Sequence, residues 1–167
     1  MRDFDRGLND RGRRGAALIG DHIREHGIKW DRVVASPAAR VKATLAGALP
    51  DITPDFDDRL YLAGAETIQE VAQAHAFPLT RDDTHEAETV LIAGHNPGLQ
   101  EVLLDLVSPS RENDLFREAT VKFPTATFAV LECHIDKWAD LKNHCAELVH
   151  FARPRDLDPE LGPEDSF

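Results

Sequence analysis

Two apolar patterns alternate along this chain: helical spacing and short continuous runs. Residues 10–26 carry apolar side chains three and four positions apart, with Asn9 or Asp10 as a cap before them and Gly27 after them. These features predict a helix over residues 10–26. The same spacing predicts further helices over residues 37–50, 65–76 and 97–107.

Short apolar runs lie between and after these helices. The run "TVLIAG" does not alternate with polar residues, which is typical of a strand buried on both faces. Strands are expected over residues 29–36, 55–62 (as a strand or an extended edge), 89–94, 125–134 and 146–154. Strands that alternate with helices predict an α/β fold of three layers, α/β/α, with a mainly parallel sheet and an antiparallel pair toward its end.

The length of 167 residues predicts one domain, which we place at residues 1–152. Residues 153–167 form an acidic tail with three prolines, to which no secondary structure is assigned. Hydrophobic residues make up 42% and charged residues 29% of the chain, a globular composition.

A net charge of −11 argues against partners that are themselves anionic, so we expect neither nucleic acid nor a membrane surface as a partner. No apolar run has the length of a membrane span and the start is charged, so the cytoplasm is the expected location. Cys133 and Cys145 are expected to be two reduced thiols. An anionic substrate would need a local basic pocket.

The stretch "SPAAR", residues 36–40, stands where a predicted strand passes into a helix. The free N–H groups of a helix start and the positive end of the helix dipole attract an anion there, beside Ser36. Arg40 lies in the first turn, and its guanidinium can donate two hydrogen bonds to a phosphate or carboxylate. A solvated arginine at a helix start is the alternative.

The stretch "VLIAGHNPGLQ" places His95 directly after a buried strand and before the next helix. Ligands of open α/β sheets bind beyond the carboxyl ends of the strands, which is where His95 is expected. A histidine there could donate a hydrogen bond to a phosphoryl oxygen or act as acid or base. A turn or capping histidine is the alternative.

Together these stretches resemble the histidine phosphatase superfamily, which has the phosphoglycerate mutase-like fold, and within it the small SixA-like phosphohistidine phosphatases. The order of the motifs carries the resemblance. The similar segments are "DFDRGLNDRGRRGA" (first helix and its lead-in), "VVASPAARVKAT" (arginine motif), "DDRLYLAGAE", "VLIAGHNPGL" (second histidine motif), "KFPTATFAVLE" and "FARPRDL".

The resemblance implies phosphoryl transfer through a covalent phosphohistidine intermediate, with neither metal nor cofactor. It implies that Arg40 and His95 bind the phosphoryl group, with Ser36 at the same helix start. Asp57, Asp58 and Glu66 lie where the wider superfamily often places an acid, and a solvated strand end is the alternative for this stretch. The implied substrate is a phosphorylated protein or a small phosphoester.

The chain departs from the family at its start. The family begins with a strand that ends in Arg-His-Gly or Arg-His-Ala and supplies the nucleophilic histidine, and residues 1–9 contain no such motif. We therefore expect a fold without its first strand and a chain with little or no activity. Because the sheet would have unpaired backbone groups, three outcomes stay open: a start upstream of Met1, closure of the sheet, or a homodimer through the exposed edge.

Two function hypotheses follow. One is a phosphatase that acts on phosphohistidine or small phosphoesters and whose catalytic start is absent from this sequence. The other is a non-catalytic phosphate-binding module that keeps Arg40 and His95. His22 and His26 have the spacing of a metal pair, but no third ligand has a suggestive spacing, so no metal site is expected.

Overall fold

The computed structural model describes residues 2–77 and 86–161. Its helices and strands are α1 (Asp10–His26), β1 (Arg32–Ala35), α2 (Ala39–Ala48), β2 (Asp55–Phe56), α3 (Ala65–Ala76), β3 (Val90–Ala93), α4 (Gly98–Leu106), α5 (Asp114–Val121), β4 (Phe128–Cys133), β5 (Ala146–Ala152) and α6 (Pro154–Leu157).

Local signals at both ends of α1 explain its length. The Asn9 side chain accepts a hydrogen bond from the backbone N–H of Gly12 at 2.8 Å and so caps the first turn. Gly27, with a φ of 83°, ends the helix in the left-handed conformation that glycine adopts without strain. The helix predicted over residues 10–26 is therefore confirmed.

The fold is an α/β fold of three layers. On one side of the strands, Ile19 of α1 and Val41 of α2 pack in one core with Phe128 of β4. On the other side, Val71 of α3 and Val102 of α4 pack in a second core that includes strand residues. Successive residues of a strand point to opposite faces, so both faces of the strands are covered, as the sequence predicts.

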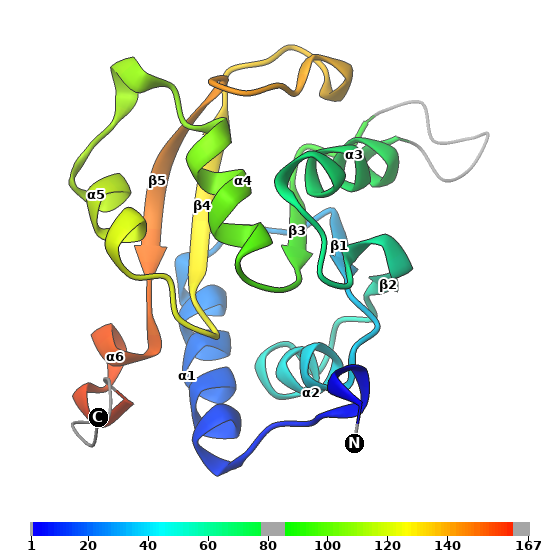
Figure 1. Ribbon diagram of the computed structural model, residues 1–167, viewed down its shortest axis with the longest axis vertical. Coiled ribbons are helices and arrows are strands. Elements are labelled where there is room, and N and C mark those ends of the chain that lie inside the picture. Colours follow the sequence, from blue (N-terminus) through cyan, green and yellow to red (C-terminus); the bar gives the residue numbers. More distant parts are fainter. Residues whose placement is uncertain (1, 78–85, 162–167) are drawn as a thin grey trace.

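The strands form two separate sheets rather than the single sheet expected from the sequence. One sheet is parallel and has the order β2-β1-β3, and the other is the antiparallel pair β4-β5. β4 lies between β5 and β3, so its outer edge faces β3 (Figure 1). Among the described residues no strand pairs with β3 on that side.

The two edges of β3 differ in their backbone hydrogen bonds. Arg32 donates to Thr89 and Ser36 donates to Ala93, so alternate residues of β3 point toward β1. The backbone groups of Val90 and Ile92 consequently point toward β4 and have no partner in any described strand. We call the space between β3 and β4 the strand gap.

Three cavities with volumes of 390, 200 and 570 Å³ lie along the strand gap, each lined by residues of both β3 and β4. Trp30 lines two of them, and its buried indole nitrogen has no hydrogen-bond partner in the described structure. A buried N–H without an acceptor is costly. Along the strand gap, the described structure therefore contains a buried indole N–H without an acceptor beside a strand edge without a described partner.

Two expectations need correction. The strand expected over residues 55–62 is only two residues long, because Asp57 accepts from the Arg59 N–H and turns the chain into the 3-10 turn Asp58–Leu60. The tail left without secondary structure contains α6 and the turn Pro159–Leu161, and α6 packs against α1. The division at residue 152 stays a prediction.

None of the described helices is both long enough and apolar enough to cross a bilayer.

Candidate functional site

The site lies where β1 and β3 end side by side. Their register pairs Ala35 with Ala93, and the Ser36 N–H donates to the Ala93 carbonyl at 2.9 Å. Because the two strands are parallel, the turns that follow them leave the sheet at the same edge. Ser36 and His95 therefore meet although they are 59 positions apart in sequence.

His95 is held between two protein groups. Its Nε2 lies 2.7 Å from Ser36 Oγ, and its Nδ1 lies 3.0 Å from Arg40 Nη2. An arginine can only donate, so Nδ1 accepts and the proton is on Nε2, which donates to Ser36. This arrangement describes a neutral imidazole.

Burial and charge both favour that neutral form. His95 is 7% exposed, and its pKa is lowered by burial first and by the positive charge of Arg40 second. Ser36 is fully buried and also accepts from the Ala38 N–H at 3.3 Å. The structure thus brings together three residues predicted from the sequence, Ser36, Arg40 and His95.

A carboxylate already lies against Arg40. Asp3 Oδ2 is 3.2 Å from Arg40 Nη1, and the Tyr61 hydroxyl donates to the same oxygen at 2.7 Å. The hydrogen bond from Tyr61, followed by the charge of Arg40, lowers the pKa of Asp3 despite some opposing desolvation. The ring of Tyr61 stands edge-on to the His95 ring, with centroids 5.3 Å apart.

Sequence reasoning missed Asp3 and Tyr61. Asp3 lies in the lead-in segment "DFDRGLN", but its partners are 37 and 58 positions away. Helical and strand periodicity carries no signal for a contact between a short turn and two distant elements. No other local feature of the sequence points to either residue.

The cavity of 390 Å³ that contains Arg40 and His95 continues into the strand gap. Its remaining lining is mainly apolar and comes from α1, α2, β3 and the segment before β4. His95 is the single histidine among the described residues that line it. One end is therefore polar and cationic, and the rest is apolar.

None of the three candidate acids, Asp57, Asp58 and Glu66, lines this cavity in the described structure. Asp58 is exposed in the turn after β2, and Glu66 is exposed in the first turn of α3. Their role stays a prediction. Asp57, next to Asp58, is bound by Arg59 and His75 instead, and the Arg59 hydrogen bond holds its pKa well below the usual range.

No group of three His, Cys, Asp or Glu side chains in the described ranges has an arrangement suited to a metal ion. A third histidine, which the sequence did not indicate, lies next to the pair His22 and His26: His150 Nε2 is 2.7 Å from His22 Nε2. Cys133 and Cys145 are free thiols, and burial raises the pKa of Cys133 to about 12.

Chemically, the site can bind an oxyanion. Arg40 Nη1 lies against the Asp3 carboxylate and Nη2 lies against His95 Nδ1, so the guanidinium holds an anionic group right beside the imidazole, and a guanidinium binds a phosphate with the same donors. The neutral imidazole next to it can take up a proton when negative charge arrives, because a nearby anion raises a histidine pKa.

No family model matches this chain. It is 33% identical over 153 residues to an uncharacterized protein of Mycobacterium leprae, a match that covers 92% of this chain and 89% of the relative. An uncharacterized protein of Mycobacterium tuberculosis is 34% identical over 154 residues, with 92% of both chains covered.

Two solved structures of SixA proteins, both assigned as phosphohistidine phosphatases, have the same fold. The protein from Nakamurella multipartitia has a TM-score of 0.77 and 33% identity, with 92% of this chain and 88% of that chain covered. The protein from Agrobacterium tumefaciens has a TM-score of 0.68 and 28% identity, with 92% and 87% covered. With this identity over nearly the whole length, and with Arg40 and His95 side by side, the chain belongs to the SixA-like group of the histidine phosphatase superfamily.

Proposed function

We propose that the Arg40/His95 site binds the phosphoryl group of a phosphorylated protein, phosphohistidine above all, and contributes to its hydrolysis without a metal ion. The observation that carries the proposal is the contact of 3.0 Å between the Arg40 guanidinium and the His95 imidazole, beside a carboxylate that Arg40 already holds. The SixA proteins with the same fold support the choice of substrate class.

In this proposal the phosphoryl group replaces the carboxylate of Asp3 on Arg40. The arriving negative charge raises the pKa of His95, so that Nδ1 takes up a proton and donates to a phosphoryl oxygen. Ser36 keeps the ring in place by accepting from Nε2. Preorganised donors of this kind stabilise the charge of a phosphoryl-transfer transition state.

The nucleophile is the second part of the proposal. The family's Arg-His-Gly or Arg-His-Ala motif has no counterpart in these 167 residues, and we propose that a strand carrying it occupies the strand gap. Three features support this: the unpaired groups of Val90 and Ile92, the unpartnered indole of Trp30, and the opening of the gap at His95. The expected outcome for this chain alone is little or no turnover.

The test compares two polypeptides on a phosphohistidine peptide and on phosphoramidate. One is this chain, and the other carries at its start an apolar strand that ends in Arg-His-Gly. The extended protein is expected to hydrolyse both substrates, and its counterpart with asparagine in place of the added histidine is the inactive control. A chelator is expected to leave the activity unchanged.

The alternative is a non-catalytic phosphate-binding module, which the occupation of Arg40 by Asp3 favours. Saturable phosphate binding by an extended protein that remains inert would support this alternative and end the enzyme proposal. A second copy of the chain is the other occupant to be tested for the strand gap, and light scattering that shows a dimer would favour it.

A further inference from the structure

A second cavity, of 480 Å³, lies beside the Arg40/His95 pocket, between the start of α1, the segment before β4, and α6. The two cavities share four lining residues, which are Leu8, Pro124, Thr125 and Ala126. They are therefore adjoining parts of one surface. We call the second cavity the side pocket.

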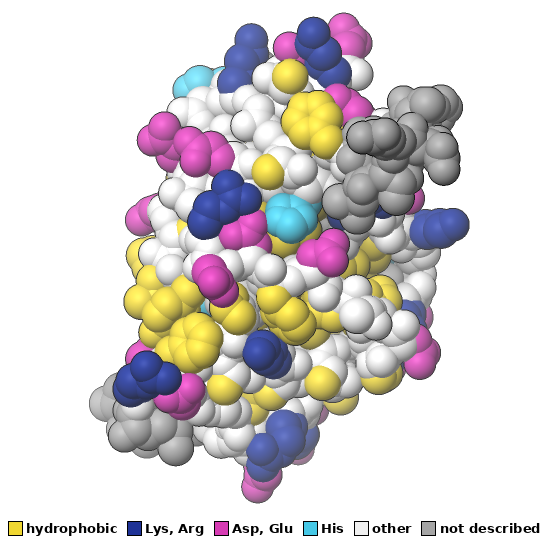
Figure 2. All heavy atoms as spheres, turned by 90° about the vertical axis from the view of Figure 1, so that its right-hand side faces the viewer, with side chains coloured by type: hydrophobic (Ala, Val, Ile, Leu, Met, Phe, Trp, Pro, Cys, Tyr) yellow, Lys and Arg dark blue, Asp and Glu magenta, His cyan; other side chains and the backbone are white. Residues whose placement is uncertain are grey.

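The side pocket differs in charge from the rest of the molecule. Its described lining includes Arg11, Lys122 and Arg155 and no acidic residue, although the chain as a whole has a net charge of −11. By contrast, acidic and basic side chains are interspersed over the face shown in Figure 2. The side pocket is the local basic surface that an anionic ligand of an acidic protein needs.

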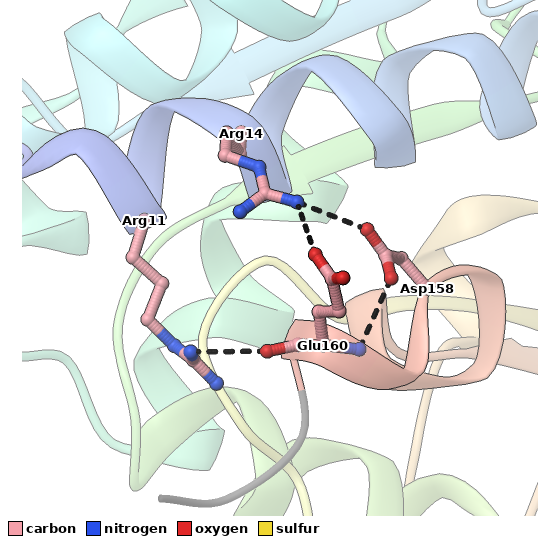
Figure 3. Close-up of polar contacts among 4 residues, drawn as sticks. All are labelled: Arg11, Arg14, Asp158 and Glu160. Atoms are coloured by element: carbon pink, nitrogen blue, oxygen red, sulfur yellow. Dashed lines mark hydrogen bonds and ion pairs between the residues drawn. The ribbon is translucent and has the colours of Figure 1, made fainter.

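The chain's own acidic residues already contact this edge of the surface. Arg14 Nη2 lies 3.1 Å from Asp158 Oδ2 and 3.3 Å from Glu160 Oε2, and Arg11 donates to the Glu160 carbonyl at 3.2 Å (Figure 3). The Arg14 side chain is 55% exposed and that of Glu160 is 78% exposed. Ion pairs this exposed are weak and salt-sensitive, so another carboxylate can replace them.

We propose that the side pocket binds an acidic segment of the phosphoprotein substrate while the phosphoryl group lies at Arg40, and that Asp158 and Glu160 compete with this segment. This inference rests on the proposed function for its phosphorylated substrate. The acidic segment is recognised by Lys122 and Arg155, with Arg11 and Arg14 at the edge. The number of Asp and Glu residues near the phosphorylated residue would then determine which phosphoproteins bind as substrates.

The test is direct binding of peptides that carry no phosphate, so it does not depend on phosphate binding or on turnover. A fluorescein-labelled decapeptide rich in Asp and Glu is titrated with this chain at low salt, and fluorescence anisotropy is recorded. A peptide with Asn and Gln at the same positions is expected to bind at least tenfold more weakly. A DNA oligonucleotide of equal charge that binds as well as the acidic peptide would overturn the assignment to protein.

Three sets of variants locate the binding. Lys122→Glu with Arg155→Glu is expected to weaken the binding of the acidic peptide at least tenfold. The control is Lys29→Glu with Lys142→Glu, two exposed lysines outside this pocket, which should change that binding by less than twofold. Asp158→Asn with Glu160→Gln is expected to tighten binding severalfold. Circular dichroism checks that each variant is folded.

Equal binding of the acidic and neutral peptides would overturn the proposal. Equal effects of the Lys122/Arg155 variant and the Lys29/Lys142 control on the binding of the acidic peptide would also overturn it. Arg40→Ala separates the two proposals because it removes the phosphate contact and leaves the side pocket intact. Loss of phosphate binding with unchanged peptide binding confirms the separation. Failure of phosphate binding in the unaltered chain contradicts the proposed function and not this inference.

Discussion

The two edges of β3 show how differently the two halves of this site are built. On the edge toward β1, backbone hydrogen bonds hold the strand in register and align Ser36, Arg40 and His95. On the edge toward β4, cavities replace backbone pairing. The half that contains Ser36, Arg40 and His95 is thus held by secondary structure, whereas on the opposite side no described strand pairs with β3.

The largest expected effect concerns the packing on the paired side. A Cβ added at Gly98 would lie 1.9 Å from the Ala63 carbonyl oxygen, so Gly98→Ala must shift the start of α4, next to His95. We expect it to lower the free energy of unfolding by roughly 2–3 kcal/mol, as measured by urea denaturation. Gly64→Ala is the control because nothing lies within 4 Å of its added Cβ. Equal stabilities of the two variants would contradict the close packing.

Hydrogen exchange contrasts the two edges of β3 directly. The amides of Leu91 and Ala93 point toward β1, and those of Val90 and Ile92 point into the strand gap. We expect the second pair to exchange at least about tenfold faster, a difference of about 1.4 kcal/mol in protection. A strand peptide seated in the gap should remove the difference, and equal protection in the chain alone would mean that the gap is already closed.

Lowering the pH is expected to destabilise the fold through buried His95 and half-buried His150. Burial and Arg40 lower the pKa of His95, while burial, His26 and His22 lower that of His150. The folded state therefore binds protons less readily than the unfolded state. The stabilising contribution is present above the unfolded pKa of about 6.5 and is lost as the pH falls through the lower folded values.

Urea denaturation between pH 8 and 5 measures this loss. His95→Asn should make the stability less dependent on pH, and the exposed His134→Asn should not. The same slope for both variants would show that His95 carries no such proton linkage.

The smallest expected effect comes from Asp3. In the proposed function its carboxylate competes with phosphate for Arg40, so Asp3→Asn should tighten the binding of inorganic phosphate about two- to fivefold, the range of an exposed ion pair. Calorimetric titration measures it. Asp5→Asn serves as the control because Asp5 pairs with Arg2, and an equal change for both variants would point to general charge instead.

The sequence predicted the side of β3 that pairs with β1 better than the side that faces the strand gap, and the reasons are physical. The helix over residues 10–26 has local caps, and the turns at Ser36 and His95 follow apolar runs that pair in parallel, so periodicity located both. The separation of the sheets depends on which strands are neighbours, a long-range property without a local signal. The contact of Asp3 with Arg40 is long-range in the same way.

The proposed function requires that Arg40 and His95 bind one oxyanion together. A titration of this chain with inorganic phosphate, followed by NMR of the His95 ring and the Arg40 side chain, tests it most directly. We expect both sets of signals to shift with a single dissociation constant, the His95 pKa to rise, and Arg40→Ala to abolish the shift at His95. Signals that move at different phosphate concentrations, or a His95 shift that survives Arg40→Ala, would contradict it.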